Sequence, residues 1–337
     1  IEGAELIGET VSDYTITAGD VKLDIADLEK KYDAVLEPIF KNSLPEMPRP
    51  VSVAYDKGCD LLTNKAPGTI AKPKVLIPVF PGTNCEYDMA AAFNRYGGEA
   101  EIFVIRNLSA KNMEDSVNEF AKRIEDSQMI AVPGGFSGGD EPEGSAKFIN
   151  AFFRNPKIKD AVENMLYARD GLMIGICNGF QALIKLGLVP FGKIVPLSSE
   201  SPTLTYNTIG RHQSQLALTK ICTNKSPWLM HCKVGEVYNI PISHGEGRFV
   251  ASDEVIAKLI ENGQIATQYV DLNGEPTMDL AYNPNSSMCA IEGIISPDGR
   301  VLGKMGHTER ISSDTCVNVD GNKEQLLFKG GVDYFRI

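Results

Sequence analysis

Hydrophobic and polar residues alternate from Lys74 onward in a pattern that predicts strands separated by helices. Short apolar runs, typical of buried strands, occupy residues 74–80, 99–105, 129–133 and 171–176. Apolar residues at helical spacing predict helices over residues 85–98, 112–127 and 178–186, with further helices up to about residue 169. Strands that alternate with helices form a parallel sheet covered on both faces, so the pattern predicts a doubly wound α/β fold.

The loops that follow these strands are expected to carry the ligand-binding chemistry, because doubly wound sheets bind ligands at the carboxyl ends of their strands. Three loops are predicted there: residues 81–85, residues 134–139 and the turn at Cys177. Beyond Val189 the pattern loosens, and residues 235–251 and 289–310 resemble antiparallel strands joined by turns. The sequence therefore predicts a mostly parallel sheet with a small antiparallel addition.

Residues 1–72 differ from the rest of the chain. Within residues 23–40 we predict an amphipathic helix, whose apolar stripe has to dock on another surface. Residues 45–73 contain five prolines and little periodicity, which predicts an extended linker. We therefore expect an N-terminal helical segment (1–44), a linker (45–73) and an α/β domain (74–337). Because the chain begins with Ile1 and not Met, we expect it to be processed or a piece of a longer chain.

The charge and composition of the chain argue against several classes of function. A formal net charge of -11 with no run of Lys or Arg argues against binding to nucleic acid or to an anionic membrane. No apolar run approaches the length of a membrane span. The seven cysteines show neither disulfide nor metal-ligand spacing. We expect free thiols, no bound metal and a cytoplasmic location.

Cys177 lies between Gly175 and Gly179, on the predicted turn from a strand to a helix. Small neighbours let the backbone close sharply there, and such a turn presents its central side chain at the top of the sheet. The helix N-terminus stabilises a thiolate, and the Asn178 amide would point at an oxyanion on an attacked carbonyl. The commoner fate of a cysteine is to be a small buried hydrophobe. The two flanking glycines favour a nucleophile.

A thiol nucleophile needs a histidine base and a carboxylate that orients it. Two histidines have a glutamate two residues further on, a spacing that puts both side chains on one face of an extended segment. These pairs are His244 with Glu246 and His307 with Glu309. The residues alone do not choose between the pairs, and either pair could also be a solvated strand end. The remaining two histidines are interpreted as surface or packing residues (His212 and His231).

The glycines of "PGGFSGG" follow a predicted strand directly, so their backbone N–H groups could complete an oxyanion hole near Cys177. One such donor changes the rate by about 10²–10³. A phosphate cradle is the alternative, but no Gly-Lys-Ser/Thr follows and the loop continues as the acidic "DEPEG". Cys85, which ends the motif "PGTNC", is expected to be a neighbour of the site and not the nucleophile.

Several motifs together resemble a known family. "GICNGFQ" resembles the nucleophile motif of class I (triad) glutamine amidotransferases. "FPGTNCEYD", "VPGGFSGGD", "ISHGEGRF" and "NPNSSMCAIEGIISPDGRVLGKMGHTER" extend the likeness, in order, to the glutaminase domain of phosphoribosylformylglycinamidine synthase. The resemblance runs from about residue 74 to residue 310. It implies a flavodoxin-like class I glutamine amidotransferase fold.

The resemblance also implies a role for each matching residue. The nucleophile would be Cys177, the base His307 and its orienter Glu309. The oxyanion would be held by backbone N–H groups of Gly135, Phe136 and Asn178. The glutamine pocket would be lined by Gln181, Ser243, His244, Gly245 and Glu246.

Two segments depart from the family pattern. Residues 207–215 keep Arg211, whereas His212, Gln213 and Gln215 differ from the usual Arg-Phe-Glu-x-Arg core. The family usually has Pro on both sides of the last motif's histidine, where this chain has Gly306 and Thr308. Those replacements loosen the backbone around His307.

The implied activity is hydrolysis of L-glutamine through a Cys-thioester. The ammonia would serve a synthetase region that uses ATP and Mg²⁺ to convert formylglycinamide ribonucleotide to its amidine in purine biosynthesis. Residues 1–44 resemble the tail of that region, and no cofactor is expected in this chain itself. Two alternatives stay open: another thiol hydrolase of the same fold, such as a γ-glutamyl hydrolase or a peptidase-like relative, and a non-catalytic module that binds a partner.

Overall fold

The computed structural model describes residues 3–41, 44–45, 47–65, 70–136 and 146–337. The chain divides into two compact units, Ile1–Pro45 and Glu46–Ile337. No helix among the described residues is long and apolar enough to cross a membrane.

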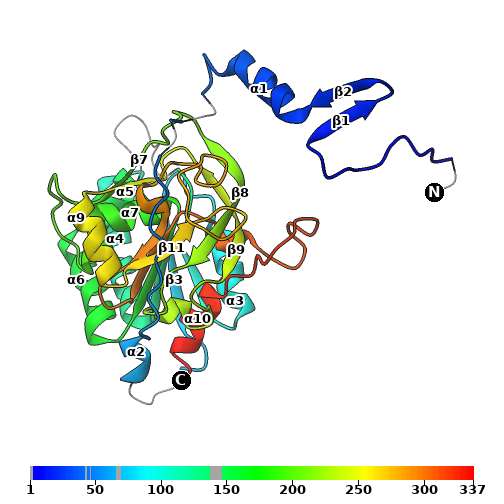
Figure 1. Ribbon diagram of the computed structural model, residues 1–337. Helices are drawn as coiled ribbons and strands as arrows, with labels where there is room; N and C mark the ends of the chain where they lie inside the picture. The colour runs from blue at the N-terminus through cyan, green and yellow to red at the C-terminus, as the bar shows by residue number, and fades with distance from the viewer. Residues whose placement is uncertain (1–2, 42–43, 46, 66–69, 137–145) are drawn as a thin grey trace. The chain divides into compact units, whose positions relative to one another are not determined.

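The larger unit is built on one mixed sheet, which has nine strands within the described residues in the order β4-β3-β5-β6-β13-β12-β11-β8-β9 (Figure 1). Its parallel strands are β3 (Lys74–Val79), β4 (Glu99–Val104), β5 (Met129–Val132), β6 (Leu172–Ile176) and β13 (Val301–Lys304). Its antiparallel strands are β12 (Ile291–Ile295), β11 (Ile265–Tyr269), β8 (Gln213–Ile221) and β9 (Val237–His244). The antiparallel part therefore continues the same sheet and forms about half of it.

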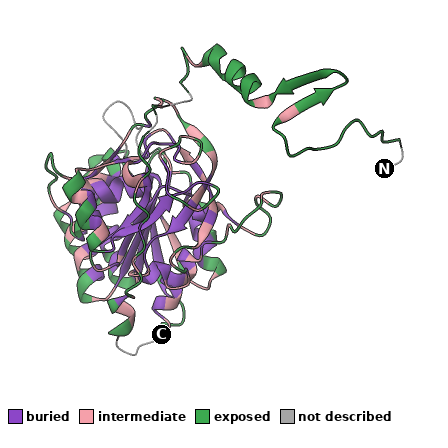
Figure 2. Ribbon diagram, viewed as in Figure 1, coloured by how far each residue is buried: buried purple, intermediate pink, exposed green. Residues whose placement is uncertain are grey.

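Helices cover both sides of this sheet (Figure 1). The longer ones are α3 (Glu86–Arg95), α4 (Ala110–Asp126), α5 (Lys147–Phe153), α6 (Pro156–Glu163), α7 (Asn178–Leu186), α9 (Asp253–Glu261) and α10 (Leu327–Tyr334). Shorter elements are α2 (Asp60–Thr63), α8 (Leu188–Phe191), the π-helix Asn164–Ala168 and the strands β7 (Thr203–Thr205) and β10 (Arg248–Val250). The central strands β5, β6 and β13 are buried along their whole length, as strands covered on both faces must be (Figure 2).

Helix starts follow local capping chemistry. The hydroxyl of Ser109 accepts a hydrogen bond from the amide of Asn112 at the start of α4, and Ser252 caps α9 through the amide of Val255. Helix α7 has no such side-chain cap, because the residue before it is Cys177.

The smaller unit consists of a hairpin, β1 (Thr15–Ala18) with β2 (Val21–Asp24), followed by α1 (Ile25–Leu36). The side chain of Asp24 caps the helix through the amide of Asp27. No residue of α1 is buried, and the predicted apolar stripe, including Tyr32 and Val35, is exposed (Figure 2).

The segment predicted as a linker lies along the larger unit over much of its described length. The amide of Val53 donates to Oε1 of Gln268 at 2.9 Å, and the amide of Tyr55 donates to the carbonyl of Cys222 at 2.8 Å. Val53 itself is buried. Backbone and side-chain hydrogen bonds thus hold this proline-rich stretch to strand β11 and to the residue that follows β8.

Two glycines set the distance between α7 and the sheet. A Cβ atom on Gly179 would lie 2.0 Å from the carbonyl oxygen of Val132, and one on Gly175 would lie 2.7 Å from the backbone of Gly179. The flanking glycines of the Cys177 turn are therefore required by backbone-to-backbone contact.

We predict that Gly179→Ala destabilises the larger unit by about 1–3 kcal/mol or more, because the clash is with backbone that cannot rotate away. Urea or thermal unfolding measures the change. Gly245→Ala is the matched control, since its Cβ would have no neighbour closer than 4.0 Å. Equal stability of the two variants would contradict the packing argument.

Candidate active site

The site begins at the turn between β6 and α7, where the structure places Cys177. Its φ of 52° and ψ of -107° lie outside the regions that non-glycine residues favour. The turn is fixed on both sides: the amide of Cys177 donates to the carbonyl of Lys304 at 2.8 Å, and its carbonyl accepts from the amide of Gln181 at 3.0 Å. Such strain at a strand-to-helix turn is typical of a presented nucleophile.

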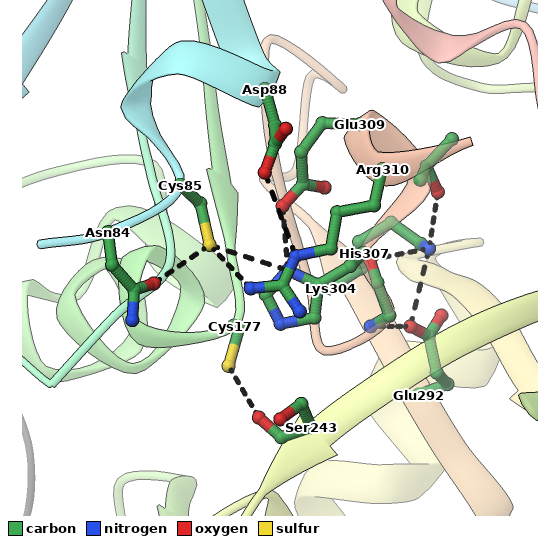
Figure 3. Close-up of polar contacts among 12 residues, drawn as sticks. Asn84, Cys85, Asp88, Cys177, Ser243, Glu292, Lys304, His307, Glu309 and Arg310 are labelled. Carbon is green, nitrogen blue, oxygen red and sulfur yellow. Dashed lines mark hydrogen bonds and ion pairs between the residues drawn. The ribbon is translucent and has the colours of Figure 1, made fainter. Parts of the chain in front are cut away.

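The thiol of Cys177 is 3.7 Å from the carbonyl oxygen of Ser243, at the end of β9 (Figure 3). Only 5% of the residue is exposed. The sulfur therefore lies in a narrow space between the α7 turn and the segment that follows β9.

The imidazole of His307 is paired with the carboxylate of Glu309. Nδ1 of His307 and Oε1 of Glu309 are 2.6 Å apart, and both side chains are almost fully buried (Figure 3). The pairing arises because residues 308–310 form one turn of 3₁₀ helix, which brings the two side chains to one side. The amide of His307 donates to the carbonyl of Pro241 at 2.8 Å, which ties this turn to β9.

Charge governs the protonation of His307. Burial opposes the charged imidazolium, but interactions with the carboxylate of Glu309, and after it with Cys177, outweigh burial and raise the pKa of His307 well above its ordinary value. Since Nδ1 is taken by Glu309, Nε2 is the nitrogen left for the thiol.

Gly134 packs against both Cys177 and His307. A Cβ atom on Gly134 would lie 2.8 Å from Cε1 of His307, 3.1 Å from Sγ of Cys85 and 3.5 Å from Cβ of Cys177. The loop after β5 therefore has to carry glycine here for the two side chains to meet.

The second histidine–glutamate pair does not form. Both ring nitrogens of His244 are buried with no hydrogen-bond partner among the described residues. Burial, followed by the neighbouring His307, lowers the pKa of His244 to about 3, so it is neutral. The backbone carbonyl of Glu246 instead accepts a hydrogen bond from Nε2 of Gln181. The geometry thus favours His307 with Glu309 as the base and its orienter.

The loop after β5 pairs with residues 82–84. Gly135 lies opposite Thr83 in an isolated antiparallel bridge, and the amide of Phe136 donates to the carbonyl of Gly82 at 2.8 Å. In such a non-hydrogen-bonded pair the amides of the two opposed residues point away from each other. The Gly135 amide is thereby turned away from Thr83, while the Phe136 amide is engaged. Residues 137–139 of the predicted loop lie outside the described residues.

A pocket of about 340 Å³ lies next to Ser243. It is lined by Phe136, Tyr206, Gly210, Arg211, His212, Gly245 and Glu246. Nε2 of His212 is 3.0 Å from Oγ of Ser243, and its ring lies 6.1 Å from that of Phe136. His212 was interpreted from the sequence as a surface or packing residue; it is exposed, but it also lines this pocket. The departure of residues 207–215 from the family pattern was the available signal.

Gln181 has a structural role within this region. Its Oε1 accepts from Nδ2 of Asn178 at 2.9 Å, and its Nε2 donates to the carbonyl of Glu246. Gln181 thus joins the first turn of α7 to the loop after β9, and it shapes the pocket by holding Gly245 and Glu246.

Cys85 lies beside the dyad. Its Sγ is 3.9 Å from Nδ1 of His307 and 3.0 Å from Nη2 of Arg310 (Figure 3). Sγ of Cys85, Nδ1 of His307 and a carboxylate oxygen of Glu309 lie within 4.8 Å of one another, close enough to be metal ligands. The His307–Glu309 hydrogen bond and the Arg310 guanidinium already use these atoms, and a cation beside that guanidinium would be repelled. The cluster therefore fits a hydrogen-bonded site better than a metal site.

The other five cysteines are free and have no place in this cluster (Cys59, Cys222, Cys232, Cys289 and Cys316). His231 pairs with Asp333 at 2.8 Å, with a half-buried ring.

The neutral state of His244 predicts a pH dependence of stability. Unfolding raises its pKa from about 3 to about 6.5, so the unfolded state binds the proton first as the pH falls. Stability is therefore lost from about pH 6.5 downward, by up to about 1.4 kcal/mol per pH unit. We predict that His244→Phe flattens this decline in urea unfolding measured between pH 7 and 4.5. Parallel curves for His244→Phe and the wild type would contradict the assignment.

The sequence was compared with known protein families and curated proteins. Residues 72–335 match the family of CobB/CobQ-like glutamine amidotransferase domains. The chain is 34% identical over 262 residues to "Phosphoribosylformylglycinamidine synthase subunit PurQ" of Chlorobium chlorochromatii, covering 75% of this chain and 93% of the relative. It is 33% identical over 249 residues to the subunit of the same name from Aquifex aeolicus, covering 74% and 95%.

A solved structure gives the same result. A chain in the structure of PurLQS from Thermotoga maritima superposes with a TM-score of 0.55 at 26% identity, covering 78% of this chain and 99% of that chain. The chain therefore belongs to the family of glutamine amidotransferase domains that forms the glutaminase part of phosphoribosylformylglycinamidine synthase.

Proposed function

We propose that this chain hydrolyses L-glutamine through a thioester on Cys177, with His307 as acid and base and Glu309 as its orienter. The observation that carries the proposal is the buried imidazole of His307. It is bonded to Glu309 at 2.6 Å, and its pKa is raised by the carboxylate of Glu309 and by Cys177, against the effect of burial. A thiolate beside an imidazolium is the reactive pair that thiol hydrolases need.

In the first half-reaction the thiolate attacks the side-chain amide carbon of glutamine, and the carbonyl oxygen becomes an oxyanion. His307 then gives its Nε2 proton to the amide nitrogen as the C–N bond breaks. Ammonia leaves and the γ-glutamyl group stays on Cys177 as a thioester. Glu309 keeps the imidazole in place and stabilises its charged form.

In the second half-reaction the neutral imidazole accepts a proton from water, and the resulting hydroxide attacks the thioester carbon. The C–S bond breaks, glutamate leaves, and the thiolate–imidazolium pair is restored. The same nitrogen of His307 thus acts as acid and then as base.

Backbone amides would stabilise the oxyanion. The Gly135 amide, turned away from Thr83, and the amide of Asn178 at the start of α7 suit this role. The Phe136 amide would have to leave the carbonyl of Gly82 to take part.

The substrate would lie with its amide at Cys177 and its α-carbon end in the pocket beside Ser243. Gly245 and Glu246 line that pocket, and Gln181 holds them there. His244 is buried and neutral behind the pocket wall, so it acts by shape and not by charge.

The ammonia would be used by a synthetase region that binds ATP and Mg²⁺ and makes formylglycinamidine ribonucleotide for purine biosynthesis. The relatives are named as subunits of the synthase that makes this amidine. A cytoplasmic location stays a prediction, and the seven free cysteines agree with it.

Residues 1–44 are proposed to be the tail of that synthetase region, with residues 45–73 as the connection to the glutaminase domain of residues 74–337. The apolar stripe of α1, which no described residue of its own unit buries, supports this proposal.

Another thiol hydrolase of the same fold is the second candidate. It would share Cys177 and His307 and differ in the length of substrate that the pocket accepts. The non-catalytic alternative is disfavoured by the buried His307–Glu309 pair, because burying an unused charged pair costs stability.

We predict that Cys177→Ala abolishes release of ammonia from glutamine and that His307→Asn lowers kcat by about 10²–10⁴, the range expected for loss of a general acid–base. A coupled glutamate dehydrogenase assay measures both. Cys316→Ser, at a partly exposed cysteine outside the site, is the control with wild-type rates. Normal turnover in Cys177→Ala refutes the mechanism, and activity confined to γ-glutamyl peptides favours the second candidate.

For the N-terminal segment, we predict that a chain of residues 46–337 keeps the glutaminase kcat and unfolding midpoint of the full chain. The reason is that every catalytic contact lies in the larger unit. Replacement of Tyr32 and Val35 by Asp should leave glutaminase unchanged and weaken binding to a synthetase region supplied in trans. Lys31→Ala on the same helix is the control. Loss of glutaminase in the shortened chain would contradict this division.

A further inference from the structure

A fully buried ion pair lies directly behind His307. The ammonium of Lys304, at the end of β13, is 3.4 Å from Oε1 of Glu292 on β12, and the two side chains are 1% and 0% exposed (Figure 3). Removing two charges from water is costly, and the attraction between them seldom repays the cost unless further hydrogen bonds satisfy both groups. The hydrogen bonds that satisfy Lys304 and Glu292 therefore indicate which part of the structure this ion pair keeps in place.

Those contacts converge on the peptide that precedes His307. Oε1 of Glu292 accepts the amide of Gly306 at 2.6 Å, and Nζ of Lys304 donates to the carbonyl of the same Gly306 at 3.1 Å. The ion pair thus binds both the backbone amide and the backbone carbonyl of Gly306. The other oxygen of Glu292 accepts from the hydroxyl of Thr267 on β11.

The residue after His307 is held by the same pair. Nζ of Lys304 donates to Oγ1 of Thr308 at 2.9 Å, and that hydroxyl donates to Oε1 of Gln325 at 2.9 Å. The three protons of the ammonium are thereby directed to Glu292, to Gly306 and to Thr308.

Gly306 leaves room for the ion pair, and the ion pair in turn restrains the backbone of Gly306. A Cβ atom there would lie 3.0 Å from Oε1 of Glu292 and 3.1 Å from Nζ of Lys304, so a side chain would push the pair away. Glycine without a restraint samples many backbone conformations, and neither neighbour of His307 is a proline. The ion pair supplies the missing restraint.

We propose that Lys304 and Glu292 are positioning residues of the glutaminase site, which clamp Gly306 and Thr308 so that His307 faces Glu309 and Cys177 at once. The inference rests on the proposed function of His307. The two residues touch no substrate, and their opposite charges leave no net charge behind the imidazole. They act through the placement of His307 alone.

The test compares single and double variants of the pair. In Lys304→Met the donors to Gly306 and Thr308 are lost and Glu292 is left as a buried unpaired charge, so both stability and kcat fall. We expect kcat to fall by about 10²-fold with KM within about threefold, as for a misplaced catalytic group.

The double variant Lys304→Met/Glu292→Gln separates positioning from stability. It removes the unpaired charge, so the unfolding midpoint recovers toward the wild-type value, whereas the donors to Gly306 and Thr308 stay absent and kcat stays low. Recovery of kcat together with stability would show that the pair is only structural and overturn the proposal. So would a wild-type kcat in stably folded Lys304→Met.

Two matched variants sharpen the result. Thr308→Ser keeps the hydroxyl and is expected to keep kcat, whereas Thr308→Val loses it and kcat falls. Arg300→Met removes a mostly buried charge that pairs with Asp170 at the opposite end of β13, so stability falls without a change in kcat. A fall in kcat for Arg300→Met as large as that for Lys304→Met would overturn the proposal, because any loss of stability would then have the same effect.

A readout besides turnover keeps this proposal distinct from the proposed function. The rate at which iodoacetamide alkylates Cys177 depends on the imidazolium beside it, and in Lys304→Met/Glu292→Gln we expect the rise of that rate to move to higher pH. This double variant leaves no unpaired charge behind the imidazole, so the shift reports the placement of His307. If the wild-type chain releases no ammonia, the proposed function fails. The alkylation profile still decides the clamp, and an unshifted profile in the double variant overturns it.

Discussion

The parallel pairing of β13 with β6 is the constraint on which the site depends. The register sets Lys304 opposite Ile176, and the amide of Cys177 then donates to the carbonyl of Lys304. β6 and β13 both end at this edge of the sheet. Cys177 follows β6 and His307 follows β13, so the thiol and the imidazole lie at the same level of the sheet. A shift of register would move His307 along the sheet and separate it from Cys177.

The ionisable side chains around His307 at this edge of the sheet are also buried. His307, Glu309, Glu292 and Lys304 are all buried, and each has a partner in the structure. In a medium of low dielectric constant such pairs interact strongly, and each side chain is held in one orientation. Glu309 therefore has two effects on His307: it favours the protonated imidazole against the opposing effect of burial, and its hydrogen bond fixes the orientation of the ring.

The parallel half of the sheet was predictable because its signals are local. Apolar runs and helical spacing over residues 74–186 are complete within each element, and α7 begins and ends where the pattern predicted. Strands β8 and β11 were not predicted, since their pairing with partners far along the chain, and not a local pattern, defines them. The size of the antiparallel part was underestimated for that reason.

The choice of base could not be made from spacing. His244 and His307 each precede a glutamate by two residues, and only the resemblance separated them. The structure separates them by long-range packing: the turn of residues 308–310 brings Glu309 onto Nδ1 of His307, whereas His244 is buried with neither ring nitrogen bonded within the described chain. Sequence spacing shows which side chains could form a pair, whereas tertiary packing determines which of these pairs forms.

In the proposed mechanism, the amide of Phe136 would make the oxyanion hole depend on the substrate. It donates to Gly82 across the Gly135–Thr83 bridge, so its use as an oxyanion donor would require one hydrogen bond to be exchanged for another. Breaking a backbone hydrogen bond costs about 0.5–1.5 kcal/mol net, whereas one oxyanion donor contributes about 2.7–4 kcal/mol in the transition state. Under this proposal the exchange would be favourable only when negative charge develops on the substrate, and the loop would stay paired before that. Gly135, with a φ of 141°, is the residue whose backbone freedom would permit that rotation.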